Sequence, residues 1–194
     1  MDESVNKREQ RFVDYVLKRK KEDTGFAANF RRATNPDTEY LSWGALASLN
    51  VNLNDDRERL PFALIGAALC ANDLEADGKY GLGAALAGCK ETTGKKDASG
   101  KSGKDGDGSQ QDNDFDDVRL RRLLACSGIR EVCQILRPLL PFINGKSKLP
   151  LSHARLLADL LYFSPRNRDA IKRRWAMEFY GASSQPDADG PAES

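Results

Sequence analysis

The stretch "VRLRRLLACSGIREVCQILRPLLPFI", Val118–Ile143, places leucines and isoleucines at helical spacing and carries five arginines but only one glutamate. Apolar residues that recur three and four positions apart are typical of helices with one buried face. The segment "CSG" interrupts the pattern, so we predict two helices, one over Val118–Ser127 and one from Gly128 or Ile129 to Asn144. Because a solvent-exposed helix face usually carries both signs of charge, this excess of arginine needs a functional explanation.

The rest of the chain also shows helical rather than strand patterns. Alternating runs of valine, isoleucine and threonine are absent, apart from the weak "NVNLN" at residues 50–54. Apolar spacing and capping residues predict further helices at about residues 5–21, 24–33, 40–49, 60–71, 81–88, 152–161 and 165–180. The predicted fold class is therefore all-α, with about seven to nine helices packed as bundles.

A low-complexity segment divides the predicted helices into two groups. Residues 91–114, "ETTGKKDASGKSGKDGDGSQQDND", contain no apolar residue larger than alanine, so they cannot bury enough surface to offset the entropy lost on ordering. We predict an N-terminal helical bundle at 1–90, a flexible insert at 91–114 and a basic C-terminal helical bundle at 115–180. Residues 181–194 are acidic and contain proline, and we expect a disordered tail there.

The net charge of the chain, +1, conceals a strong segregation of charge along the sequence. Residues 118–175 hold 13 lysines and arginines against three acidic residues, a net charge of +10. Residues 91–117 carry −4, residues 1–90 carry −1, and the last 19 residues carry −4. Because clustered like charges repel one another unless a partner neutralises them, this pattern indicates a polyanionic partner such as nucleic acid.

The sequence offers little support for catalysis, a metal or a cofactor. No two of the four cysteines have C-x-x-C spacing, and the only histidine, His153, has no nucleophile nearby. There is no Walker-type phosphate loop, and "GLGAALAG" at residues 81–88 only superficially resembles a dinucleotide-binding motif. We therefore expect no enzyme activity, no metal and no cofactor. The absence of a secretory signal or an apolar run of about 18 residues predicts a cytoplasmic protein that does not enter a membrane.

The arginines remain as the one candidate functional constellation, and they have two interpretations. Each alone fits a solvated helix face, but ten net positive charges within 58 residues favour contact with nucleic acid. No aromatic ladder interleaves them, which favours binding of the phosphate backbone over base stacking. The alternative is a helical scaffold whose basic face docks an acidic protein partner.

Four stretches, taken together in this order, resemble the CasB family, the small subunit of the type I-E CRISPR Cascade complex. They are "GFAANFRRA" (25–33), "GLGAALA" (81–87), "FDDVRLRRLLACSGIREVCQILRPLLPFI" (115–143) and "LPLSHARLLADLLYFSPRNRDAIKRRWAMEFY" (149–180). The long insert and the acidic tail depart from the family pattern.

The resemblance implies an all-helical, non-catalytic subunit that is present in two copies. Its implied partners are other Cascade subunits, the guide RNA, and the target and displaced DNA strands, which it would hold by the backbone while RNA–DNA pairing reads the sequence. The basic positions that match the family motifs are Arg31, Arg32, Arg119, Arg121, Arg122 and Arg137. Charge alone adds Arg130, Arg166, Lys172, Arg173 and Arg174. Under this hypothesis the arginine-rich helices form a rail for phosphates, which supply the missing negative charge.

Overall fold

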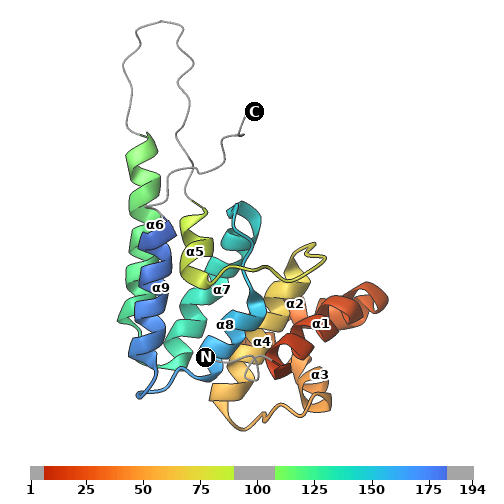
Figure 1. Ribbon diagram of the computed structural model, residues 1–194. Helices are drawn as coiled ribbons and strands as arrows, with labels where there is room; N and C mark the ends of the chain where they lie inside the picture. Colours follow the sequence, from red (N-terminus) through yellow and green to blue (C-terminus); the bar gives the residue numbers. More distant parts are fainter. Residues whose placement is uncertain (1–6, 90–107, 183–194) are drawn as a thin grey trace, which may run out of the picture.

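The computed structural model describes residues 7–89 and 108–182, which form nine α-helices and one 3-10 helix (Figure 1). In chain order these are α1 (Lys7–Glu22), α2 (Thr24–Arg32), η1 (Pro36–Ser42), α3 (Trp43–Ser48), α4 (Asp56–Ala71), α5 (Leu82–Ala87), α6 (Gly108–Ala125), α7 (Ile129–Lys146), α8 (His153–Leu161) and α9 (Arg168–Ala182). Within the described ranges, the only strand-like pairing is an isolated bridge between Tyr80 and Leu151. The predicted all-α fold class is confirmed.

Helix α6 differs from the sequence-based prediction. It begins at Gly108, whereas the apolar pattern predicts a start at Val118. The polar residues before Val118 carry no apolar spacing, but Asp116 is nevertheless buried in the structure. The last part of the predicted insert, residues 108–114, is therefore helical. The predicted tail begins within α9, and the remainder of both segments lies outside the described residues.

Helix α4 occupies the middle of the molecule. All of its residues from Leu60 to Cys70 are buried, and a helix that is apolar on every side must be enclosed by its neighbours. It packs against α1 and α2 on one side and against α7 and α8 on the other (Figure 1). A glycine permits one of these contacts, because a Cβ atom at Gly66 would lie 2.3 Å from the ring of Phe30 on α2.

The two predicted helical groups share a single hydrophobic core. Its buried members include Phe30 and Leu69 from the N-terminal group, and Leu136 and Trp175 from the C-terminal group. The segment between α5 and α6 therefore separates the two groups in the sequence, while their apolar faces meet in the structure.

The glycines of "GLGAALAG" allow α5 to lie directly against α9. A Cβ atom at Gly83 would lie 2.0 Å from the backbone oxygen of Trp175, so only glycine fits this approach. The backbone N–H of Gly83 donates a hydrogen bond to Oε2 of Glu178 at 3.3 Å, and Arg155 on α8 pairs with the same carboxylate. The motif that superficially resembles a cofactor loop is therefore a site of helix packing.

Asp77 binds the N-terminus of α8 from the loop after α4. It accepts hydrogen bonds from the backbone N–H groups of His153 (2.7 Å) and Ala154 (3.1 Å), and it lies 3.0 Å from Nδ1 of His153. Burial raises the pKa of Asp77, but these hydrogen bonds outweigh burial and hold the pKa below its ordinary value. The ionised carboxylate therefore stabilises the fold.

We expect Gly83→Ala to destabilise the protein by about 1–3 kcal/mol, because the new methyl group meets backbone atoms of α9 that cannot rotate away. Gly145→Ala is the matched control, since a Cβ atom there meets nothing within 4 Å and alanine favours the helix. Thermal unfolding followed by circular dichroism measures both. A Gly83→Ala variant that melts at the wild-type temperature would show that α5 and α9 are not tightly packed.

We expect Asp77→Asn to lower the free energy of unfolding by about 1–2 kcal/mol at neutral pH. A carboxylate whose folded pKa is depressed stabilises the protein above its unfolded pKa, and this contribution disappears as the pH falls through the folded pKa. The gap between wild type and variant should therefore close below about pH 4 in urea titrations at several pH values. The exposed Asp37, changed to asparagine, is the control and should leave the acid dependence unchanged. A gap that stays constant down to acid pH would rule out the charge of Asp77 as its cause.

Candidate nucleic-acid interface

The arginines of α6 lie beside carboxylates of the same helix. Nη1 of Arg119 donates to Oδ1 of the buried Asp116 at 2.7 Å, and the guanidinium lies 4.0 Å from the ring centroid of Phe142. Nη2 of Arg121 pairs with Oδ2 of Asp117 at 2.6 Å. Two acids of the "FDD" run therefore neutralise two of the three arginines that follow them.

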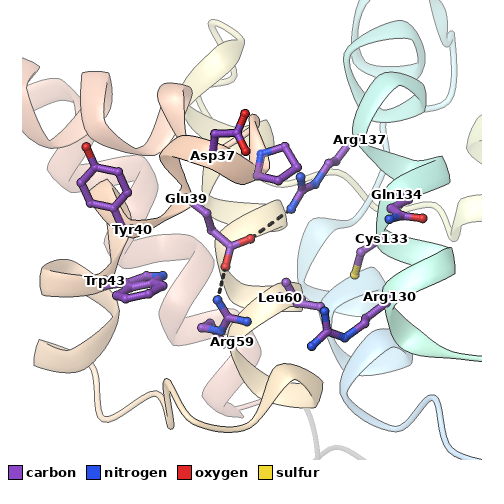
Figure 2. Close-up of a pocket in the computed structure, with 11 residues that line it drawn as sticks. Asp37, Glu39, Tyr40, Trp43, Arg59, Leu60, Arg130, Cys133, Gln134 and Arg137 are labelled. Carbon is purple, nitrogen blue, oxygen red and sulfur yellow. Dashed lines mark hydrogen bonds and ion pairs between the residues drawn. The ribbon is translucent and has the colours of Figure 1, made fainter.

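The arginines of α7 pair with acids from distant parts of the chain. Nη2 of Arg137 lies 3.0 Å from Oε2 of Glu39, whose other oxygen is 2.7 Å from Nη1 of Arg59 on α4 (Figure 2). The Glu39 side chain is 5% exposed and that of Arg137 is 14% exposed. Removing one partner of such a buried pair costs about 3–5 kcal/mol, so Arg137 belongs to the fold.

Asp56, at the start of α4, extends this network to the surface. It pairs with Arg59 and also with Arg130, the first arginine of α7. The hydrogen bond from Arg59 is the main cause that holds the pKa of Asp56 below its ordinary value. Arg130 is still 72% exposed, so it combines a carboxylate partner with access to solvent.

Arg174 on α9 is paired as well. It bonds to Asp159 of α8, which also accepts a 2.7 Å hydrogen bond from Nε1 of the fully buried Trp175. Burial raises the pKa of Asp159, against the opposing effects of the hydrogen bond from Trp175 and the positive charge of Arg174. Arg174 therefore neutralises a buried carboxylate that links α9 to α8.

These pairs correct the expectation that phosphates supply the negative charge missing from the opening stretch. Of its five arginines, only Arg122 has no ion-pair partner among residues 7–89 and 108–182. The counter-charges come from Asp116 and Asp117 just before the stretch, and from Glu39 and Asp56, which the fold brings to it. That the stretch forms a rail for phosphates stays a prediction, and four of its five arginines already have carboxylate partners.

Six of the eleven predicted positions have side chains without an ion-pair partner in the described part of the chain. They are Arg31, Arg32, Arg122, Arg166, Lys172 and Arg173, of which all but the half-buried Lys172 are exposed. Arg31 and Arg32 end α2. The other four lie on α6, on α9 and in the turn before α9. These six predicted positions are therefore available to an external polyanion.

Four of these cations lie near the point where α6 ends and α9 begins: Arg122, Arg166, Lys172 and Arg173. Nη1 of Arg168 donates to the backbone oxygen of Ser127 at 2.9 Å, which ties the two helix ends together. Burial raises the pKa of the Cys126 thiol, and Lys172 is near enough for its charge to offset part of that rise. Because Cys126 is one helical turn beyond Arg122 and its thiol donates to the Arg122 oxygen, Arg122 and Lys172 flank the same junction.

Two clefts lie along α7. The first cleft, of about 410 Å³, is bounded by η1 and α3 on one side and by α7 on the other, with Glu39 between them (Figure 2). The second cleft is lined by the start of α4, the start of α7 and Pro165, the residue before Arg166. Arg130 lines both clefts. Thr38 of η1 donates a 2.6 Å hydrogen bond to the backbone oxygen of Arg32, which links η1 to the end of α2.

The first cleft also contains two residues that the sequence analysis did not select. Tyr40 is 56% exposed and Trp43 is 39% exposed, and both line the cleft opposite Arg130. The guanidinium of Arg59 lies 5.6 Å from the centroid of the Trp43 ring. Along the chain no aromatic side chain interleaves the arginines, but the fold places two aromatic residues beside them. The available signal in the sequence was two large aromatic residues three positions apart, beside the polar stretch that forms η1.

The histidine and the cysteines, which are the remaining residues that could act in catalysis or bind a metal, are buried. His153 is 1% exposed and lies between Asp77 and Asn144. The four cysteines are free and buried, and burial raises the pKa of Cys70 and Cys89 to about 11 and that of Cys133 to about 12. Among the described residues, no group of three or more His, Cys, Asp or Glu side chains is arranged to hold a metal ion. No helix in the same ranges is long and apolar enough to cross a membrane.

Comparison with solved structures finds this arrangement of helices in CasB proteins. The crystal structure of CasB from Thermus thermophilus matches with a TM-score of 0.59 and 23% sequence identity over 89% of this chain and 97% of that one. CasB from M. ruber matches with a TM-score of 0.65 and 21% identity, over 91% and 94% of the two chains. A second Thermus thermophilus structure, of a CRISPR-associated protein of the Cse2 family, matches with a TM-score of 0.60 and 24% identity, over 89% and 97%.

At the level of sequence, no curated protein matches the chain. The family model for CRISPR-associated protein Cse2, in contrast, matches residues 27–180, a range that includes all four motifs except the first two residues of "GFAANFRRA". The chain therefore belongs to the Cse2 family of CRISPR-associated proteins, the CasB family that its sequence motifs resemble.

Proposed function

We propose that this Cascade subunit holds the backbones of the guide RNA and of the target and displaced DNA strands, without reading their sequence. In this role it is a non-catalytic component of a type I-E complex in the cytoplasm, next to the other Cascade subunits and a second copy of itself. Its contribution to antiviral defence is to stabilise the R-loop, in which the guide pairs with one DNA strand and displaces the other.

The observation that carries this proposal is that six of the eleven predicted basic positions have no internal counter-charge in the described part of the chain. Holding like charges together on a surface is unfavourable unless an anion meets them. Guanidinium groups suit phosphate, because their planar fork donates two parallel hydrogen bonds to one anion. The six are Arg31, Arg32, Arg122, Arg166, Lys172 and Arg173.

The paired arginines have different parts in this proposal. Arg121 and Arg130 are each 72% exposed and stand beside the free cations, so they add to the local positive field although each has a carboxylate partner. Arg119, Arg137 and Arg174 are held by buried acids, and we assign them to the stability of the interface rather than to phosphate binding.

The state of the reactive side chains supports a non-catalytic role. The only histidine in the sequence is enclosed by hydrogen-bond partners, so it is not accessible as a general base. With pKa values of about 11 to 12, the thiols of Cys70, Cys89 and Cys133 stay protonated at neutral pH and are poor nucleophiles.

Two neighbouring arginines of α6 provide a test in which the change of charge is the same. Arg122→Gln removes a cation without an internal partner among the described residues, so the slope of log affinity against log salt for a non-specific DNA duplex should fall by about 1. Arg121→Gln removes a cation that Asp117 already neutralises, so its slope should change less. Fluorescence anisotropy with the full-length protein at several salt concentrations measures both slopes.

Equal slopes for the two variants would show that binding depends on total charge and not on the free guanidinium groups. If the wild-type protein binds neither duplex nor single-stranded nucleic acid at low salt, its basic surface does not hold a backbone. A basic face that instead captures an acidic protein would form a complex that resists nuclease treatment, and this outcome would replace the proposal.

A further inference from the structure

The first cleft exposes two aromatic side chains that the core does not use. Tyr40, within η1, is 56% exposed, and Trp43, the first residue of α3, is 39% exposed. Both line the same cleft, across from Arg130 and Gln134 of α7 (Figure 2). Single exposed aromatics are common on protein surfaces, but two in one cleft beside arginines are the composition of a binding site.

The guanidinium of Arg59 packs against the indole ring of Trp43 and helps to hold it in place. Arg59 lies 5.6 Å from its centroid, and ion pairs with Glu39 and Asp56 hold the guanidinium of Arg59. Because both partners are fixed by the surrounding helices, the ring loses little conformational entropy when a flat ligand stacks on it. Because a guanidinium lies next to the ring, the site also favours binding of an aromatic ligand that has hydrogen-bond acceptors.

The cleft has an excess of hydrogen-bond donors. Arg59, Arg130 and Arg137 line it, against the carboxylates of Asp37 and Glu39. Nε of Arg59 and Nη1 of Arg137 are buried and have no hydrogen-bond partner among the described residues. Arg130, on the wall opposite Trp43, is accessible enough to meet an anion at the cleft entrance. An acceptor-rich, planar, negatively charged ligand fits this combination, and a nucleotide has all three properties.

We propose that the first cleft binds one unpaired nucleobase of a single strand, stacked on Trp43 with Tyr40 beside it, while the adjoining phosphate contacts Arg130. The base must be unpaired, because in a duplex both faces of each base are covered by stacking. This inference rests on the proposed function, which brings nucleic acid to Arg31 and Arg32 at the end of α2, shortly before η1 in the chain. It adds a contact to the base that backbone binding does not include.

The positions of the two tryptophans allow a direct test. Trp175 is fully buried, so quenching of tryptophan fluorescence by a bound base reports on Trp43. The full-length protein is titrated with a thymidine oligomer of about 12 nucleotides and with an abasic oligomer of the same length and phosphate count. We expect quenching by the thymidine oligomer only, and an affinity for it about 5- to 150-fold above that for the abasic oligomer.

Variants connect this preference to the cleft. Trp43→Ala should bring the two oligomers to the same affinity, whereas Trp43→Phe should retain part of the preference because a phenyl ring still stacks. Tyr162→Ala is the matched control, since Tyr162 is 50% exposed but does not line the first cleft. It should leave the preference unchanged. The comparison of the two oligomers on the wild-type protein needs no variant and stands if a variant fails to fold.

The outcomes separate this inference from the proposed function. Equal affinity for both oligomers without quenching would overturn base stacking and leave backbone binding intact. Binding of neither oligomer at low salt would overturn both. Quenching by another Cascade subunit in the absence of nucleic acid, together with equal oligomer affinities, would show that Trp43 meets protein and would also overturn the inference.

Discussion

The buried carboxylate of Glu39 holds the functional face of this protein together. It pairs with Arg59, 20 residues away on α4, and with Arg137, 98 residues away on α7. A carboxylate buried to this extent is costly without such partners, so its pairing fixes η1 against both helices. The same pairing removes Arg137 from the surface and places Arg59 below the Trp43 ring. The burial of Arg137 and the position of Arg59 beside the Trp43 ring both depend on this one side chain.

The segregation of charge along the sequence is partly cancelled by the fold. The stretch with a net charge of +10 lies against acids that come from before it: Glu39, Asp56, Asp116 and Asp117. The predicted cations without an ion-pair partner are therefore fewer than the sequence suggests, but they are better defined. They lie at the end of α2 and around the junction of α6 with α9, and Arg130 lines both clefts. A count of charges along a sequence thus indicates a polyanion partner, whereas the ion pairs decide which side chains are free to meet it.

The sequence predicted the helices well and the site only in part, for physical reasons. Amphipathic spacing depends on local sequence, so α1, α7 and α8 were predicted to within a few residues, whereas the polar start of α6 gave no apolar signal. Motif and charge together selected Arg122, which has no ion-pair partner among the described residues. An ion pair between residues far apart in the sequence, such as Glu39 and Arg137, produces no pattern in the local sequence from which it could be predicted. The cleft position of Trp43 likewise depends on how η1 packs against α7, which no periodicity encodes.

A base-stacking residue is compatible with a protein that does not read sequence. Every nucleobase has an aromatic face, so an indole that stacks on one base accepts all four with similar affinity, unlike a hydrogen-bond donor aimed at a base edge. What a stack does distinguish is a paired base from an unpaired one. Phosphate contacts from the free cations are equally available to duplex and single strand, so on their own they cannot favour an opened duplex. Under the proposed function, a contact that only an unpaired base can make would favour opened DNA over duplex, and we propose that Trp43, held by Arg59 and through it by Glu39, makes that contact.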